Sequence, residues 1–111
     1  MFLTLYQLIK KYSPRVKGLA FKLLFYSKRI SIGKNFRCDT WPSVIIDVNA
    51  KLIIGDQVTL RRNVEIRAHG YSTIHLKGNN RIDRGVRILG NNNAKISIGI
   101  NTRIGLYTVL N

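Results

Sequence analysis

The sequence predicts an all-β fold, a parallel β-helix in which the chain winds through stacked coils of short strands. Apolar side chains recur every 22 residues in four columns, and no insertion breaks that spacing. Three of the columns lie six residues apart, as expected where each face of a coil buries one aliphatic side chain. The four columns are Ile32, Ile54, Leu76 and Ile98; Cys38, Leu60, Ile82 and Ile104; Val44, Ile66, Ile88 and Leu110; and Ile30, Leu52, Ile74 and Ile96.

The first part of the chain, residues 1–29, is predicted to be a basic amphipathic helical segment that precedes the β-helix of residues 30–111. Its apolar side chains recur at helical spacings of three or four residues, and Pro14 predicts a break between two short helices. Residues 1–38 contain nine Lys and Arg and no acidic residue, in a chain of net charge +14. The periodic positions are Leu5, Leu8, Ile9 and Tyr12 before the break and Val16, Leu19, Ala20, Leu23 and Leu24 after it.

Two compatible roles are expected for this segment. It can cap the open N-terminal end of the solenoid, and basic amphipathic helices also bind anionic membrane surfaces. Nucleic acid is a weaker expectation, because the basic residues do not alternate with solvent-facing aromatic residues in a recognisable module. The sequence contains neither a cleavable signal nor a long apolar run, and its single cysteine, Cys38, fits a reducing compartment. We therefore expect a cytoplasmic protein, peripheral at the inner face of the membrane.

The length of the coil predicts a place for a functional site. Three hexads account for 18 of the 22 residues, so we expect each coil to extrude a loop of about four residues after its third face. These loops, near residues 46–49, 68–71 and 90–93, should stack along one corner, and loops on a rigid scaffold are frequent sites of function. The catalytic candidate there is His69, and the substrate-binding candidates are Arg67, Tyr71, Asn91 and Asn92.

Other polar columns are expected to support the scaffold. Asn35, Gln57, Asn79 and Asn101 form a predicted amide ladder, and opposite charges alternate along Asp39, Arg61 and Asp83 and from Glu65 to Arg87. The second histidine, His75, is predicted to point outward from a strand. Because neither histidine is expected to have an acidic residue beside it in the repeat, no metal site is predicted.

The segments Ile32-Gly33-Lys34-Asn35-Phe36, Ile54-Gly55-Asp56-Gln57-Val58 and Ile98-Gly99-Ile100-Asn101-Thr102 resemble the hexapeptide repeats of the left-handed β-helix acyltransferases. The resemblance covers residues 28–111 and departs from the motif at Lys77 and Asn80. It implies a left-handed solenoid, against the usual right-handed rule for parallel crossovers. Residues 60–70 and 82–88 are similar to bacterial transferases that acetylate sugars of exopolysaccharide or O-antigen.

This resemblance implies transfer of acetyl from acetyl-CoA, the co-substrate, to a hydroxyl of a polysaccharide or lipopolysaccharide sugar, within a homotrimer. A histidine then acts as general base, and the resemblance places it in a later coil than any of these 111 residues. We therefore expect a solenoid truncated at its C-terminal end and inactive alone. The alternatives are a non-catalytic scaffold or surface-binding module and, more distantly, a metal-dependent hydratase, which would need three histidine ligands.

Overall fold

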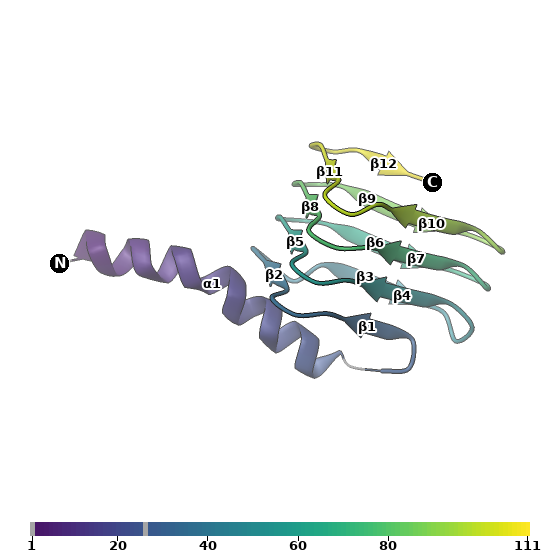
Figure 1. Ribbon diagram of the computed structural model, residues 1–111, viewed down its shortest axis with the longest axis horizontal. Coiled ribbons are helices and arrows are strands. Elements are labelled where there is room, and N and C mark those ends of the chain that lie inside the picture. Colours follow the sequence, from purple (N-terminus) through teal and green to yellow (C-terminus); the bar gives the residue numbers. More distant parts are fainter. Residues whose placement is uncertain (1, 26) are drawn as a thin grey trace.

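The computed structural model describes residues 2–25 and 27–111 and consists of one N-terminal helix followed by a parallel β-helix (Figure 1). Positions 1 and 26 of the predicted N-terminal segment lie outside the described residues. The helix is α1 (Phe2–Leu24). The strands are β1 (Ile30–Ile32), β2 (Arg37–Cys38), β3 (Ser43–Ile46), β4 (Lys51–Ile54), β5 (Thr59–Leu60), β6 (Glu65–Ala68), β7 (Thr73–Leu76), β8 (Arg81–Ile82), β9 (Arg87–Gly90), β10 (Lys95–Ile98), β11 (Arg103–Ile104) and β12 (Val109–Leu110).

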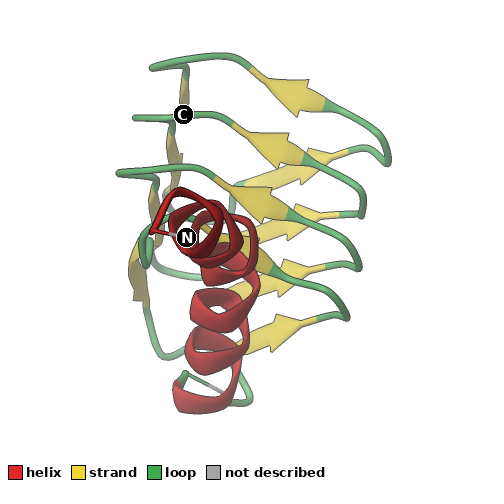
Figure 2. Ribbon diagram, turned by 90° about the vertical axis from the view of Figure 1, so that its left-hand side faces the viewer, coloured by secondary structure: helices red, strands yellow, loops and turns green. Residues whose placement is uncertain are grey.

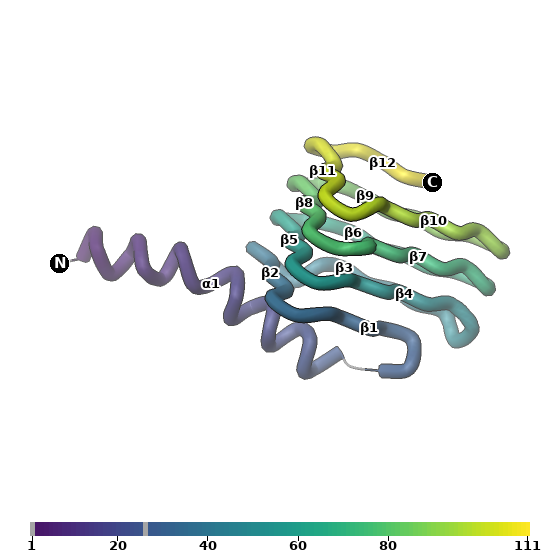
Figure 3. Tube along the Cα trace, in the orientation of Figure 1, coloured from purple at the N-terminus to yellow at the C-terminus, as the bar shows by residue number. Residues whose placement is uncertain are grey.

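The strands form three parallel sheets, one on each face of the solenoid. Their orders are β1-β4-β7-β10, β2-β5-β8-β11 and β3-β6-β9-β12. Residues 22 apart lie opposite each other, as Leu52 does with Ile74, which confirms the predicted register. In Figure 1 the chain runs from right to left in front and returns behind while it rises, so the β-helix is left-handed. The tube in Figure 3 follows the same path through successive coils.

The four residues beyond three hexads do not form an extruded loop, so that prediction is wrong. Within one coil β4, β5 and β6 contain 4, 2 and 4 residues. Turns of equal length, residues 55–58, 61–64 and 69–72, join these strands at the three corners. The additional residues lengthen two of the three faces, because each gains a second inward side chain. The cross-section has two long faces and one short face, made by β2, β5, β8 and β11.

The core is the interior of the stacked coils, as the columns predict. Cys38, Leu60 and Ile82 are completely buried, and burial raises the pKa of the Cys38 thiol to about 11, so Cys38 is an inert core residue. Asn80, where the hexapeptide motif fails, is also buried. Its amide nitrogen donates to the carbonyls of Gly99 and Thr102 at 2.8 and 3.1 Å, and its oxygen accepts from the amide of Gly78 at 3.0 Å. This polar side chain is therefore accommodated by its hydrogen bonds.

The residues of the predicted amide ladder are favoured by their backbone conformation as well as by side-chain hydrogen bonding. Asn35, Gln57, Asn79 and Asn101 all have positive φ, between 45° and 66°, and asparagine tolerates this left-handed region better than most residues. One rung of the ladder is present, since Asn79 Nδ2 donates to Asn101 Oδ1 at 2.7 Å. Two pairs of the predicted charge columns are confirmed, since Arg61 Nε pairs with Asp39 and Arg87 Nε with Glu65, both at 2.8 Å.

The N-terminal segment forms one continuous helix, so the predicted break at Pro14 is wrong. A proline inside a helix removes one backbone hydrogen bond and costs about 3 kcal/mol. Here the C-terminal half of α1 is held by packing on β2, and this tertiary contact offsets the local cost. None of the described helices is long and apolar enough to cross a membrane.

The helix packs on the first coil through a small number of side chains. Phe21 is buried and its ring lies 4.5 to 6.2 Å from the rings of Phe25, Phe36 and Trp41. Gly18 lies against the backbone of Phe36, where a Cβ atom would stand 2.1 Å from the carbonyl oxygen. Figure 2 shows the helix in front of the coils, with the strands behind it. The predicted contact between the helical segment and the N-terminal coil is therefore present.

Candidate functional site

The predicted site lies at the corner where the two long faces meet. Three turns stack there, residues 47–50, 69–72 and 91–94, at the right-hand end of the solenoid in Figure 1. Backbone hydrogen bonds join one turn to the next: the His69 amide donates to the carbonyl of Gly90 at 2.8 Å and the Tyr71 amide to that of Asn92 at 2.7 Å. The corner is thus a rigid, solvent-facing ridge with equivalent positions repeated in each coil.

His69 has an acidic partner, which contradicts the prediction that no acid lies near it in the repeat. Its Nδ1 atom is 3.3 Å from Oδ1 of Asp47, and the other carboxylate oxygen accepts a 2.9 Å hydrogen bond from the amide of Gly70. The two side chains come from equivalent positions of adjacent coils, 22 residues apart. The same column continues to Asn91. The spacing that defines the core columns could have found this pair.

The charge of Asp47 influences which nitrogen of the His69 imidazole carries the proton. The hydrogen bond from the Gly70 amide, then that from His69 and the nearby charge of Arg29, hold the pKa of Asp47 below its usual value. An ionised carboxylate can only accept, so it favours the tautomer of His69 in which Nδ1 carries the proton and Nε2 has the free lone pair. The side chains of His69 and Asp47 are 40% and 43% exposed, so a large substrate can approach this nitrogen.

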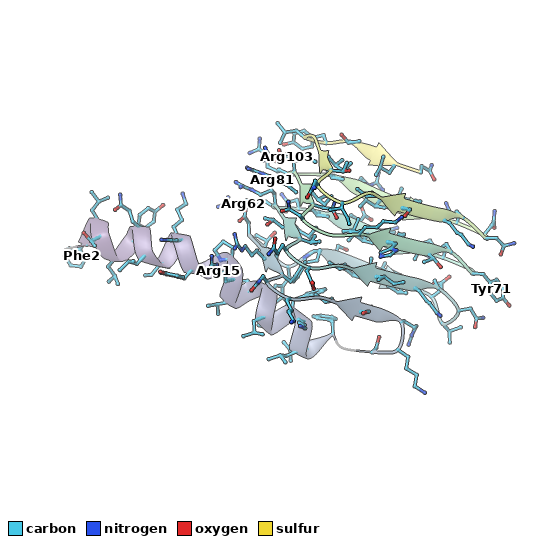
Figure 4. All side chains as sticks on the ribbon, viewed as in Figure 1. Phe2, Arg15, Arg62, Tyr71, Arg81 and Arg103 are labelled. Atoms are coloured by element: carbon cyan, nitrogen blue, oxygen red, sulfur yellow. The ribbon has the colours of Figure 1, made fainter. Side chains whose placement is uncertain are left out.

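The predicted substrate-binding residues divide between the corner and the neighbouring face. Tyr71 is 68% exposed and extends from the tip of its turn (Figure 4). Asn91 lies next to His69 along the stack, whereas Asn92 adopts a positive φ of 58° and serves the turn. Arg67 lies on β6, before the corner, where its Nε atom pairs with Glu65. His69, Tyr71 and Asn91 thus share one ridge, and Arg67 borders it.

His75 is separate from this corner. It lies on the outer face of β7, opposite Ile53 of β4 and Ser97 of β10. Within residues 2–25 and 27–111, no three histidine, cysteine, aspartate or glutamate side chains gather in a way that could hold a metal ion. The chemistry available at the ridge is therefore that of an oriented imidazole.

A second feature was not predicted, a basic groove between α1 and the short face of the solenoid. Its volume is about 630 Å³. Arg62 and Arg84 are 22 residues apart, as are Arg81 and Arg103, so the repeat stacks arginines. Figure 4 shows Arg62, Arg81 and Arg103 along the edge of the solenoid toward α1. The groove is lined in part by Lys10, Lys17, Asp39, Arg61, Arg62 and Arg84. The spacing of these arginines was the available signal, but only the helix packing creates the groove.

Two carboxylates make stability depend on pH. Bonds from Arg87 and the charge of Arg67 lower the pKa of Glu65, as the Gly70 amide and His69 do for Asp47. A lowered pKa stabilises the folded state above the ordinary carboxyl pKa of about 4, and this contribution is lost as pH falls through the folded value. We expect the melting temperature to change little between about pH 7 and 5 and to fall below about pH 4.

Glu65→Gln provides the control for this pH dependence. The variant should melt at a lower temperature than the wild type at pH 7, and its melting temperature should fall less on acidification. Thermal unfolding followed by circular dichroism across this range measures both. An unchanged pH profile in the variant would show that Glu65 does not contribute.

Comparison of the chain with protein-family models, with curated proteins and with solved structures finds no match.

Proposed function

We propose that this protein is an O-acetyltransferase that moves acetyl from acetyl-CoA to a hydroxyl of a polysaccharide or lipopolysaccharide sugar. The proposal rests on the resemblance of its repeats to the hexapeptide acyltransferases. The observation that carries the mechanism is the contact between His69 and Asp47 on an exposed ridge. Because this contact leaves Nε2 of His69 able to accept a proton, His69 becomes the proposed general base of the chain. This proposal departs from the sequence-based expectation that the base lies in a later coil and that these 111 residues alone are inactive.

The proposed reaction needs one base and no metal ligand set. Nε2 of His69 removes the proton of the sugar hydroxyl while the hydroxyl oxygen attacks the carbonyl carbon of the thioester. The tetrahedral intermediate collapses with cleavage of the carbon–sulfur bond, and the leaving thiolate takes the proton from the imidazolium. The products are an acetyl ester of the sugar and the free thiol of coenzyme A. Asp47 acts as a positioning residue, since it orients the imidazole.

The surroundings of the ridge suit an anionic donor and a bulky acceptor. Lys51 and Lys95 begin the strands that follow two of the corner turns, and both lie in register with Thr73. These exposed ammonium groups can attract the phosphates of coenzyme A. The ridge is convex rather than enclosed, so an oligosaccharide can reach it, and Tyr71 offers an aromatic face on which a sugar ring can pack. We extend the proposal to a homotrimer, which the resemblance implies.

Release of free thiol from acetyl-CoA tests this function. The full chain is incubated with acetyl-CoA in the presence and absence of oligosaccharide acceptors, and the thiol is titrated with a chromogenic disulfide. We expect release that depends on the acceptor. Thiol release that is the same without acceptor would indicate hydrolysis of the thioester instead of transfer. No release above that seen without protein, with any acceptor, would favour a non-catalytic solenoid. Light scattering under the assay conditions measures whether the active species is a trimer.

A further inference from the structure

The helix α1 carries an apolar surface that the solenoid does not cover. Ten hydrophobic side chains of this helix are between 46% and 70% exposed, and seven of them lie along one side of it. We call this surface the α1 stripe. Its residues are Leu5, Leu8, Ile9, Tyr12, Val16, Leu19 and Leu23.

The middle of the α1 stripe faces away from the solenoid, whereas Ile9, Val16 and Leu19 at its edges border hollows between α1 and the coils. At 3.6 residues per turn its members fall within an arc of about 120° that contains no charged residue. Gly18 and Phe21, which pack on the first coil, project from the opposite side of the helix. The packing that attaches α1 to the β-helix therefore uses one side of the helix and leaves the apolar side to solvent, where an exposed surface of this kind indicates a binding site.

Basic residues border the α1 stripe on both sides. Arg15 and Lys22 lie beyond one edge, and Lys10 and Lys17 lie beyond the other, whereas residues 2–25 include no acidic residue. Lys17 and Lys22 also donate to the carbonyls of Asp39 and Gly33 in the first coil, at 2.9 and 3.2 Å, so they hold the helix in this orientation. An apolar arc between two cationic borders is the arrangement of a helix that lies in the interface of an anionic bilayer.

The charge pattern distinguishes between possible occupants of the stripe. A second copy of α1 would bring two sets of cationic borders together, in a chain whose net charge is already +14, and this repulsion opposes pairing. Nucleic acid would satisfy the charges but would leave the aliphatic side chains exposed. An anionic bilayer satisfies both, because acyl chains accept the apolar arc and headgroups accept the basic borders.

We propose that α1 docks this protein on an anionic membrane surface, with the α1 stripe inserted below the headgroups and the basic residues of its borders at the headgroup level. The proposal does not depend on catalysis. Docking leaves the ridge that carries His69 in water, because Tyr71 and the N-terminal end of α1 lie at opposite ends of the molecule, whose longest extent is 53 Å (Figure 4). The acceptor reached from such a position is a saccharide held near the membrane.

Flotation of the full chain with vesicles tests the proposal. One set is neutral phosphatidylcholine, and the other contains phosphatidylglycerol. The test variant combines Leu8→Glu with Val16→Glu on the stripe. The matched control combines Thr4→Glu with Gln7→Glu, which changes the charge equally at exposed positions outside the stripe. Fluorescence of Trp41, the single tryptophan, checks that α1 remains packed on the first coil.

We expect the wild type to bind anionic vesicles at least about tenfold more tightly than neutral ones, and high salt to weaken this binding. The affinity of the stripe variant for anionic vesicles should be at least about tenfold lower than that of the matched control. The reason is that only the glutamates of the stripe variant must enter the apolar layer. Equal losses in the two variants would overturn insertion of the stripe. Absence of vesicle binding would also overturn the proposal. In that case, self-association in sedimentation would identify a second copy as the occupant of the stripe, and binding of a nucleic-acid duplex would identify nucleic acid as the partner. His69→Ala should bind vesicles as the wild type does, which separates this proposal from the proposed catalysis.

Discussion

Replacement of His69 by alanine is expected to lower the rate of acetyl transfer by about 10²–10⁴-fold, the usual contribution of a general base. The loss should appear in kcat, because the imidazole acts on the proton that moves in the transition state. The measurement is the initial rate of thiol release at saturating acetyl-CoA and acceptor. The side chain is exposed and its removal leaves the core intact, so the variant should melt within a few degrees of the wild type.

Two further variants make the result for His69 specific. Asp47→Asn keeps the shape of the residue but removes the charge that orients the imidazole, so its loss of rate should be smaller than that of His69→Ala, with an unchanged KM for acetyl-CoA. His75→Ala is the matched control, because His75 lies on the outer face of β7, away from the ridge. A rate for His69→Ala equal to that of the wild type would exclude His69 as the base.

Replacement of Ile82 by alanine is expected to lower the free energy of unfolding by about 2–5 kcal/mol, as for other completely buried aliphatic residues. Ile82 lies in the middle of its column, between Leu60 and Ile104, so the cavity would interrupt packing between coils. Denaturation in urea measures the change. Arg81→Ala is the control on the same strand, because Arg81 is exposed and its loss should cost less than about 0.5 kcal/mol. Equal losses in both variants would contradict the assignment of this column to the core.

Much of the fold follows from the sequence, because in a repeat protein the same residue spacing recurs in every coil and fixes the register of the strands. Ile54, Leu76 and Ile98 occupy equivalent places in successive coils, and each pair confirms the spacing of the others. The extruded loop was wrong because the hexad count treats all faces as equal. The alternation of inward residues in Leu52 and Ile54, and again in Ile66 and Ala68, already indicates two longer faces.

The predicted break at Pro14 was wrong because tertiary packing is not visible in the local sequence pattern. Pro14 predicts a break, but α1 continues through it, and packing of Gly18 and Phe21 on the first coil stabilises the half of the helix that follows Pro14. That packing also determines which side of α1 is exposed. The sequence predicted an amphipathic helix, but it did not show that the apolar side faces away from the solenoid.

The candidate site was predicted in part. His69, Tyr71 and Asn91 do share one ridge, because the repeat places them at the same corner. Asp47 was missed although it precedes His69 by one repeat and so occupies the equivalent position of the adjacent coil. The basic groove depends on how α1 sits against the short face, and residue spacing alone does not determine that arrangement.

The most direct test of the proposed function is the fate of the acetyl group itself. The full chain is incubated with acetyl-CoA labelled with ¹³C in the acetyl group and with an oligosaccharide acceptor, and the products are followed by nuclear magnetic resonance and mass spectrometry. We predict a new ¹³C ester on a sugar hydroxyl that forms in step with free coenzyme A and that His69→Ala abolishes. Coenzyme A released together with ¹³C-acetate, while the acceptor remains unmodified, would contradict transfer to a sugar.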